Sequence, residues 1–122
     1  MAKQNITDLS YLHEISMGDD ELVAEMIALF LENVPRSIKR LKTLVQQEEW
    51  DEVASITHRL KPNLAYVGLD SAKAIIEHIE KRARVGNNAI GKNNMSVEIL
   101  RLEQLCRQSY KELNEALKEL GS

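Results

Sequence analysis

The chain has 122 residues, with 16 Lys or Arg and 19 Asp or Glu, so its formal net charge is −3. This length suits one domain over residues 1–122, large enough to bury a core without disulfides. A single cysteine excludes a disulfide framework and a cysteine-based zinc site. An apolar signal core, a run of about 18 apolar residues and a basic stripe are all missing from the sequence. We therefore expect a cytoplasmic protein without membrane insertion or a nucleic-acid partner.

Residue usage favours helices along the whole chain. Ala, Leu, Glu, Lys and Gln dominate, whereas there are only five glycines and two prolines. Apolar residues recur at helical spacing, and the connections between these stretches are short. The pattern predicts an all-α domain: an up-and-down antiparallel four-helix bundle with an additional short N-terminal helix. We expect a monomer, because one such bundle can bury its own apolar stripes.

Two predicted helices occupy the N-terminal part of the chain. Thr7 or Asp8 can cap a short first helix. After a Gly-containing break, Asp19 or Asp20 offers the cap of a long second helix. Its apolar spacing resumes after Pro35, so we expect one long helix with a kink at that residue; two separate helices are the alternative. The apolar residues of the short first helix are Leu9, Leu12 and Ile15.

Three more helices are predicted to follow. The third begins near Trp50 and ends by Gly68, and the fourth is capped by Asp70. Residues 85–94, rich in Gly and Asn, predict the one long loop, and a last helix runs from about 95 to 120. The predicted core-facing residues are Val53, Ile56, Leu60, Leu64 and Val67 in the third helix, Ala72, Ile75, Ile76, Ile79 and Ala83 in the fourth, and Leu102, Leu105, Cys106, Ser109, Leu113 and Leu117 in the last.

His58 lies away from the apolar stripe of the third helix. At about 100° per residue it falls roughly 160° from the centre of that stripe, so we expect it to face solvent. A neutral imidazole can accept and return a phosphoryl group, and an ammonium one turn away could stabilise the charge. The alternative interpretation is an ordinary solvated helix face. The neighbours of His58 at helical spacing are Ala54, Ser55, Lys61, Pro62 and Ala65.

The run Thr57-His58-Arg59-Leu60-Lys61, followed by Gly68, resembles the His-x-Leu-Lys signature of the histidine-containing phosphotransfer (HPt) domain. Residues 12–15, 30–35 and 75–80 are similar to other parts of that family, so the resemblance covers nearly the whole chain. It implies that His58 is the phosphorylated nucleophile and that Lys61 stabilises charge beside the phosphoryl group. It also implies that Gly68 allows close helix packing or a turn below the site.

Two positions depart from the family pattern. Many members carry Gly directly after the lysine, where this chain has Pro62. Proline removes a backbone donor, so a kink or a lost helical bond is expected near His58. The position 22 residues after the histidine, where Gln is frequent, is Glu80. A carboxylate there would orient the imidazole by holding one ring nitrogen as a donor, although it would also repel a phosphoryl group. The alternative is a surface acid paired with Lys73 or Arg84.

The resemblance implies a phosphorelay intermediate. His58 would accept a phosphoryl group from a receiver-domain aspartate and pass it to another receiver aspartate. The expected partners are receiver domains of response regulators and a hybrid sensor kinase. The receiver would hold the Mg, and this chain would bind no cofactor. Because no Gly-rich phosphate loop occurs, we expect a phosphocarrier without autokinase activity and not an enzyme.

The receiver is expected to dock over the third helix and the neighbouring apolar surface of the first. A metal site is not expected, because neither His13 nor His78 has a second ligand four residues further on. The alternative function is a non-catalytic helical adaptor that binds or blocks a receiver without phosphotransfer; it predicts binding that survives loss of His58. The presence of both His58 and Lys61 favours transfer. The expected partner-binding residues are Leu9, Leu12, Ala54, Ser55, Pro62, Ala65 and Gly68.

Overall fold

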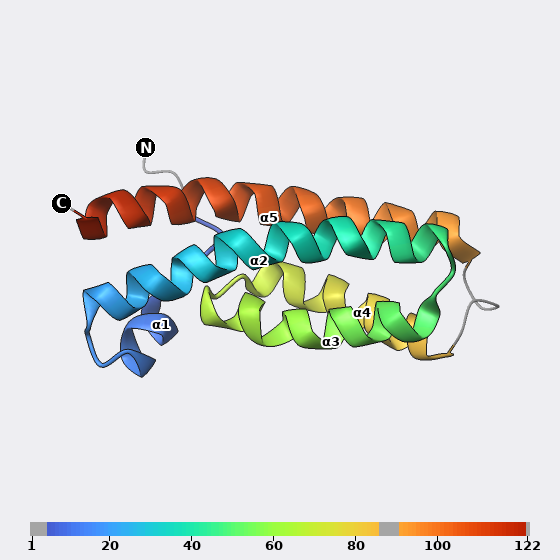
Figure 1. Ribbon diagram of the computed structural model, residues 1–122, viewed down its shortest axis with the longest axis horizontal. Coiled ribbons are helices and arrows are strands. Elements are labelled where there is room, and N and C mark those ends of the chain that lie inside the picture. Colours follow the sequence, from blue (N-terminus) through green and yellow to red (C-terminus); the bar gives the residue numbers. More distant parts are fainter. Residues whose placement is uncertain (1–4, 86–90, 122) are drawn as a thin grey trace.

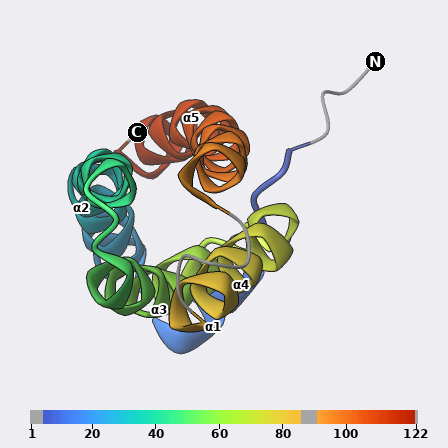
Figure 2. The same ribbon diagram turned by 90° about the vertical axis from the view of Figure 1, so that its right-hand side faces the viewer.

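Helices make up almost all of the structure (Figure 1). The computed structural model describes residues 5–85 and 91–121, with the backbone alone for residues 91–93. The helices are α1 (Ser10–Ile15), α2 (Asp20–Gln46), α3 (Trp50–Tyr66), α4 (Asp70–Val85) and α5 (Gly91–Gly121). Helices α2 to α5 form a ring in which each packs against the next, and α5 closes the ring against α2 (Figure 2). The predicted four-helix bundle with a short N-terminal helix is confirmed.

Local signals set the start and the continuity of the first two helices. Asp19 caps α2, because its Oδ1 accepts hydrogen bonds from two backbone N–H groups of the first turn. The α2 helix continues through Pro35, so the prediction of one long helix holds. The N-cap residue of α1 is Leu9, whose side chain forms no cap. Asp8 acts from one residue earlier, since its Oδ1 accepts a hydrogen bond from the N–H of Ser10.

The last helix starts earlier than the sequence predicts. Gly and Asn are weak helix formers, so their abundance predicts a loop over residues 85–94, yet α5 begins at Gly91. Residues 86–90 lie outside the described part of the chain. Met95 and Ile99 are fully buried in the core and hold the first turns of α5 in place. Packing of an amphipathic face therefore outweighs the local preference for a loop.

The core is one continuous cluster to which every helix contributes. The stripes predicted on α3, α4 and α5 face it, with Ile75, Leu105 and Leu117 only partly buried. Helices α2 and α5 extend beyond the shorter pair α3 and α4, and α1 packs against α2 at that end (Figure 1). Across the described residues, none of the helices combines the length and apolar character that a membrane span would require.

The N-terminal segment is tied to α5 by a buried carboxylate. Glu112 accepts hydrogen bonds from the backbone N–H groups of Ile6 and Thr7 and from the Thr7 hydroxyl, at 2.7–3.1 Å. Burial raises the pKa of Glu112, but these hydrogen bonds outweigh it and the net shift is downward. The N–H of Asp8 then donates to the carbonyl of Val67, 2.9 Å away, at the end of α3. The segment thus anchors α1 to the bundle.

Replacing Glu112 with alanine is expected to lower the free energy of unfolding by about 2 kcal/mol, because three donors lose a charged acceptor. Amide hydrogen exchange at Ile6 and Thr7 should become faster at the same time. Urea denaturation and exchange measured by NMR test both effects. The control is Glu115→Ala on the exposed face of the same helix. Equal losses in the two variants would contradict an anchoring role for Glu112.

Candidate functional site

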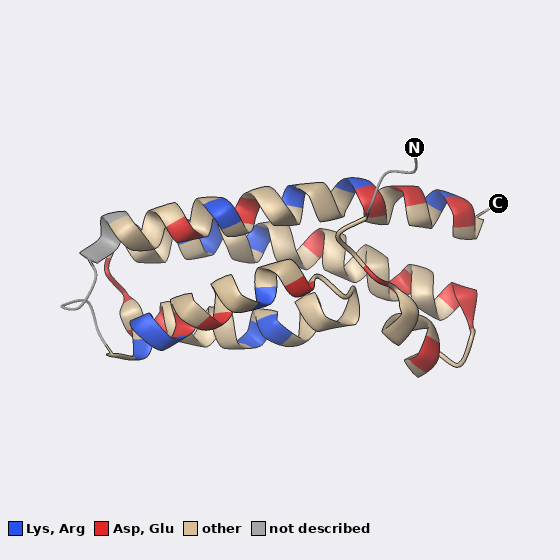
Figure 3. Ribbon diagram, turned by 180° about the vertical axis from the view of Figure 1, so that it is seen from behind, with Lys and Arg blue, Asp and Glu red and all other residues tan. Residues whose placement is uncertain are grey.

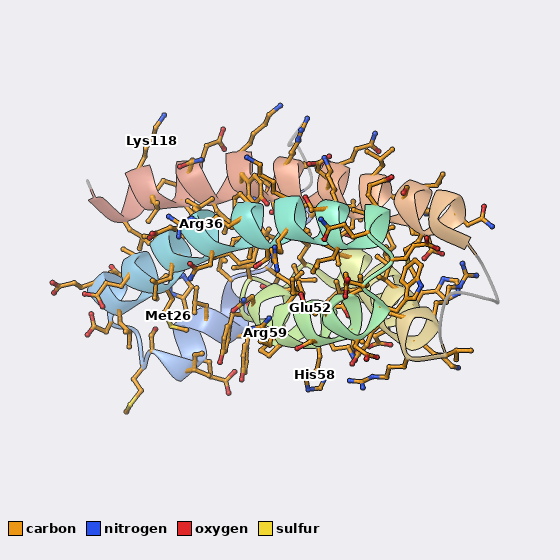
Figure 4. All side chains as sticks on the ribbon, turned by 45° about the vertical axis from the view of Figure 1, so that its right-hand side comes forward. Met26, Arg36, Glu52, His58, Arg59 and Lys118 are labelled. Atoms are coloured by element: carbon orange, nitrogen blue, oxygen red, sulfur yellow. The ribbon has the colours of Figure 1, made fainter. Side chains whose placement is uncertain are left out.

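His58 lies on the outer face of α3, where its side chain is 65% exposed. Figure 4 shows the ring pointing away from the bundle. The apolar residues of the same helix, among them Leu60 and Leu64, are buried. This exposure confirms the prediction that His58 faces solvent. The prediction succeeds because the direction of the side chain follows from helix geometry alone.

A nearly buried carboxylate from α4 holds the ring of His58. Glu80 Oε2 lies 3.1 Å from His58 Nδ1, and Glu80 Oε1 lies 2.5 Å from Lys61 Nζ. Arg84, one turn further along α4, donates to the same Oε2 from Nη2 at 2.7 Å and from Nε at 3.1 Å. Glu80 touches the imidazole, as the first interpretation expects, and it also pairs with Arg84, but it is buried and therefore not a surface acid. Lys73 lies apart, along the hollow between α3 and α4.

The charge of Glu80 decides which nitrogen of the neutral His58 ring carries the proton. The pKa of Glu80 is lowered from 4.5 to about 2, mainly by the hydrogen bond from Lys61; Arg84 adds to this shift and burial opposes it. At neutral pH the carboxylate is ionised and only accepts hydrogen bonds. His58 Nδ1 must therefore be the donor, and in the neutral ring Nε2 keeps its lone pair. The site presents an exposed, oriented nitrogen nucleophile.

The low pKa of Glu80 makes this site a source of acid sensitivity. A carboxylate with a pKa lower in the folded than in the unfolded protein stabilises the fold above the unfolded value, and this contribution is lost as the pH falls toward the folded value. Between pH 5 and the folded pKa of about 2, the stability advantage of wild type over Glu80→Gln should shrink by about 1–2 kcal/mol. Urea denaturation across this range measures it.

The control for that titration is Glu32→Gln, which removes an exposed ion pair with Arg36 on α2. Exposed pairs contribute little, so the pH profile of this variant should run parallel to that of wild type. A Glu80→Gln profile that also runs parallel to wild type would contradict a strongly lowered pKa for Glu80.

His58 stands between two open hollows. The first lies between α3 and α4, has a volume of about 380 Å³ and is lined by Lys61, Pro62 and Ala65 among others. The second has a volume of about 440 Å³ and includes Ser55 and Arg84 in its lining. Basic and acidic residues alternate along this part of the bundle, whereas acidic residues gather at the α1 end (Figure 3). A partner approaching His58 therefore meets a recessed surface of mixed charge.

Two of the residues expected on the docking surface are buried. Leu12 is fully buried, because the apolar face of α1 covers the core. Ala54 is only 5% exposed, so at most its edge reaches the second hollow. Leu9 is half-buried against the core. The docking expectation is thus corrected for Leu12 and Ala54, while Ser55, Pro62 and Ala65 are exposed beside His58.

Gly68 belongs to the turn between α3 and α4 rather than to an open surface. Its φ of +63° lies in the left-handed region, and a Cβ there would be 2.3 Å from the carbonyl oxygen of Asp8. Glycine at this position thus allows the turn and lets the N-terminal segment pack closely against it. Pro62 lies within α3, which continues to Tyr66. Since proline has no N–H, it leaves the carbonyl of His58 without that helical hydrogen bond.

The sequence did not predict Arg84 as a residue of the site. From the sequence, Arg84 was one of two candidate partners for Glu80 as a surface acid. Its spacing of four residues from Glu80 was the available signal, because such pairs are neighbours on a helix. What the spacing alone does not show is that Glu80 also reaches across to His58 and Lys61 on α3.

A second histidine has a similar arrangement on another side of the bundle. His78 Nδ1 on α4 lies 2.8 Å from Oε1 of Glu98 on α5, and Arg82 Nη1 lies 3.3 Å from the same oxygen. Glu98 thus holds a ring and a guanidinium, as Glu80 does. The pair His78 and Arg82 supplies matched controls for substitutions at His58 and Arg84.

The chain matches the family model of the Hpt domain over residues 25–121, which include the site. Among solved structures, it is similar to the HPT domain from the Hpt sensor hybrid histidine kinase from Shewanella, with a TM-score of 0.77. The two are 17% identical, over 96% of this chain and 97% of that one, so this likeness shows the fold alone. No curated protein matches the chain.

Proposed function

Because this chain belongs to the Hpt domain family, we propose that His58 accepts a phosphoryl group from a receiver-domain aspartate and passes it to another receiver aspartate. Hpt domains serve in histidine phosphotransfer in phosphorelays, as phosphocarriers rather than kinases. The observation that carries the proposal is the exposed ring of His58, held at Nδ1 by Glu80 with Nε2 facing outward.

The proposed step is an attack by the Nε2 lone pair on the phosphorus of the aspartyl phosphate. The bond from phosphorus to the aspartyl oxygen breaks, and the carboxylate leaves with the electron pair. The ring keeps its Nδ1 proton and becomes positively charged, which the ionised carboxylate of Glu80 stabilises. The reverse attack, by a second receiver's aspartate, returns the ring to its neutral form.

Lys61 supplies positive charge next to the transferred group in this proposal. It lies on the same helix as His58, one turn further on, and lines the same hollow. The magnesium required by the reaction is assigned to the receiver, and this chain is assigned no cofactor and no kinase activity. We further propose a cytoplasmic monomer whose partners are receiver domains and a hybrid sensor kinase, docking around Ser55, Pro62 and Ala65.

The test is transfer of labelled phosphate to this chain from a panel of purified, phosphorylated receiver domains. A label that is acid-labile and base-stable has the chemistry of a phosphohistidine, and mass spectrometry of the digested protein locates it. We expect the label on the peptide that contains His58. If no receiver labels the folded protein but some bind it, the adaptor function replaces phosphotransfer.

A further inference from the structure

The two oxygens of Glu80 are divided between two cations. Lys61 contacts Oε1, whereas Arg84 and the ring of His58 share Oε2. Counting these side chains with a neutral ring, one negative charge faces two positive charges. The site therefore holds one more cation than the carboxylate needs for neutralisation.

A phosphoryl group on His58 would change this balance. It adds about two negative charges close to an ionised carboxylate, and the positive charge that the ring gains offsets only one of them. Like charges repel, and water screens this repulsion less where the carboxylate is buried, so Glu80 needs a counter-charge. Lys61 alone cannot neutralise Glu80 and contact the phosphoryl oxygens at once, because it ends in a single ammonium.

We propose that Arg84 is a positioning residue that neutralises Glu80 and thereby frees Lys61 to move from Oε1 to the phosphoryl group on His58. This inference rests on the proposed phosphotransfer. It explains how a carboxylate can support the imidazole of His58. Without Arg84, repulsion between that carboxylate and the phosphoryl group would oppose the transfer.

The geometry indicates which cation stays and which moves. Arg84 donates two N–H groups to one oxygen and comes from the same helix as Glu80, so local spacing maintains the pair. Lys61 comes from α3, as His58 does, and makes one contact through a flexible side chain. The two cations also line different hollows on either side of His58, so Lys61 can turn without displacing Arg84.

The first test measures phosphorylation by phosphoramidate, a small donor that releases ammonia and needs no receiver. The rate in Arg84→Gln should be about tenfold below that of wild type, since Lys61 is then retained by Glu80. In the double variant Glu80→Gln/Arg84→Gln, the rate should lie within about twofold of that of Glu80→Gln, because no carboxylate remains to be neutralised. Arg82→Gln, the matched control beside His78, should behave as wild type.

The second test needs no phosphoryl transfer. Urea denaturation of the variants Lys61→Met and Glu80→Gln, singly and together, measures the coupling between these side chains. This coupling, expressed as a ratio of unfolding constants, should rise about threefold when Arg84 is also replaced by glutamine. The inference is overturned if the coupling does not change, or if Arg84→Gln slows phosphorylation no more than Arg82→Gln. Failure of wild type to accept phosphate from any donor would instead overturn the proposed function.

Discussion

Replacing His58 with glutamine is expected to lower phosphoryl transfer to this chain more than about a thousandfold, because the nucleophile is lost. Glutamine is chosen because its amide nitrogen can donate to Glu80 as Nδ1 does, so the carboxylate keeps a partner. The side chain of His58 is 65% exposed, and the unfolding free energy should change by less than about 0.5 kcal/mol. Labelled transfer from receiver domains, together with urea denaturation, measures both quantities.

The control for this substitution is His78→Gln. His78 is also held at Nδ1 by a glutamate, so the two variants remove equivalent hydrogen bonds. Transfer to His78→Gln should stay within about twofold of wild type, since His78 has no part in the proposed site. Label that persists in His58→Gln and disappears in His78→Gln would move the chemistry to the other histidine.

Replacing Gly68 with alanine is expected to destabilise the protein by about 3 kcal/mol or more. The new Cβ would lie 2.3 Å from the carbonyl oxygen and 2.8 Å from the Cβ of Asp8, and the φ of +63° is unfavourable for alanine. The backbone of Asp8 has little freedom to move, because its N–H is bonded to Val67 and the preceding residues to Glu112. Urea denaturation followed by circular dichroism measures the loss.

Gly18→Ala separates the two contributions to that loss. Gly18 has a φ of +79°, but a Cβ there would have nothing within 4 Å. Its substitution should cost only the backbone term of about 1 kcal/mol. If Gly68→Ala costs no more than Gly18→Ala, the N-terminal segment moves aside without loss, and its close packing against the turn does not stabilise the fold.

Features that depend on one helix were predictable from the sequence. Asp19 caps α2 because a short acidic side chain can accept hydrogen bonds from the first free N–H groups, whatever surrounds the helix. His58 is exposed because its angle from the apolar stripe follows from the helical repeat. The continuation of α2 through Pro35 lay at the limit of such reasoning, since the sequence allowed two outcomes.

Features that depend on two helices were not predictable in the same way. The sequence suggests Glu80 as a support for the imidazole, but not that Lys61 and Arg84 divide its two oxygens. Leu12 has the same apolar character whether α1 presents it to a receiver or to the core; only the packing of α1 decides that it is buried.

The sequence by itself determined the class of the fold, the order of the helices and the histidine that faces solvent, because propensity, capping and periodicity act over neighbouring residues. The tertiary structure decided the charge arrangement around that histidine, the contact of Gly68 with Asp8 and the early start of α5. These depend on residues far apart in the chain, and their distances are set by how whole helices pack. A local pattern carries no information on that packing. The positions of Lys61 and Arg84 around Glu80 are therefore known only from the folded structure.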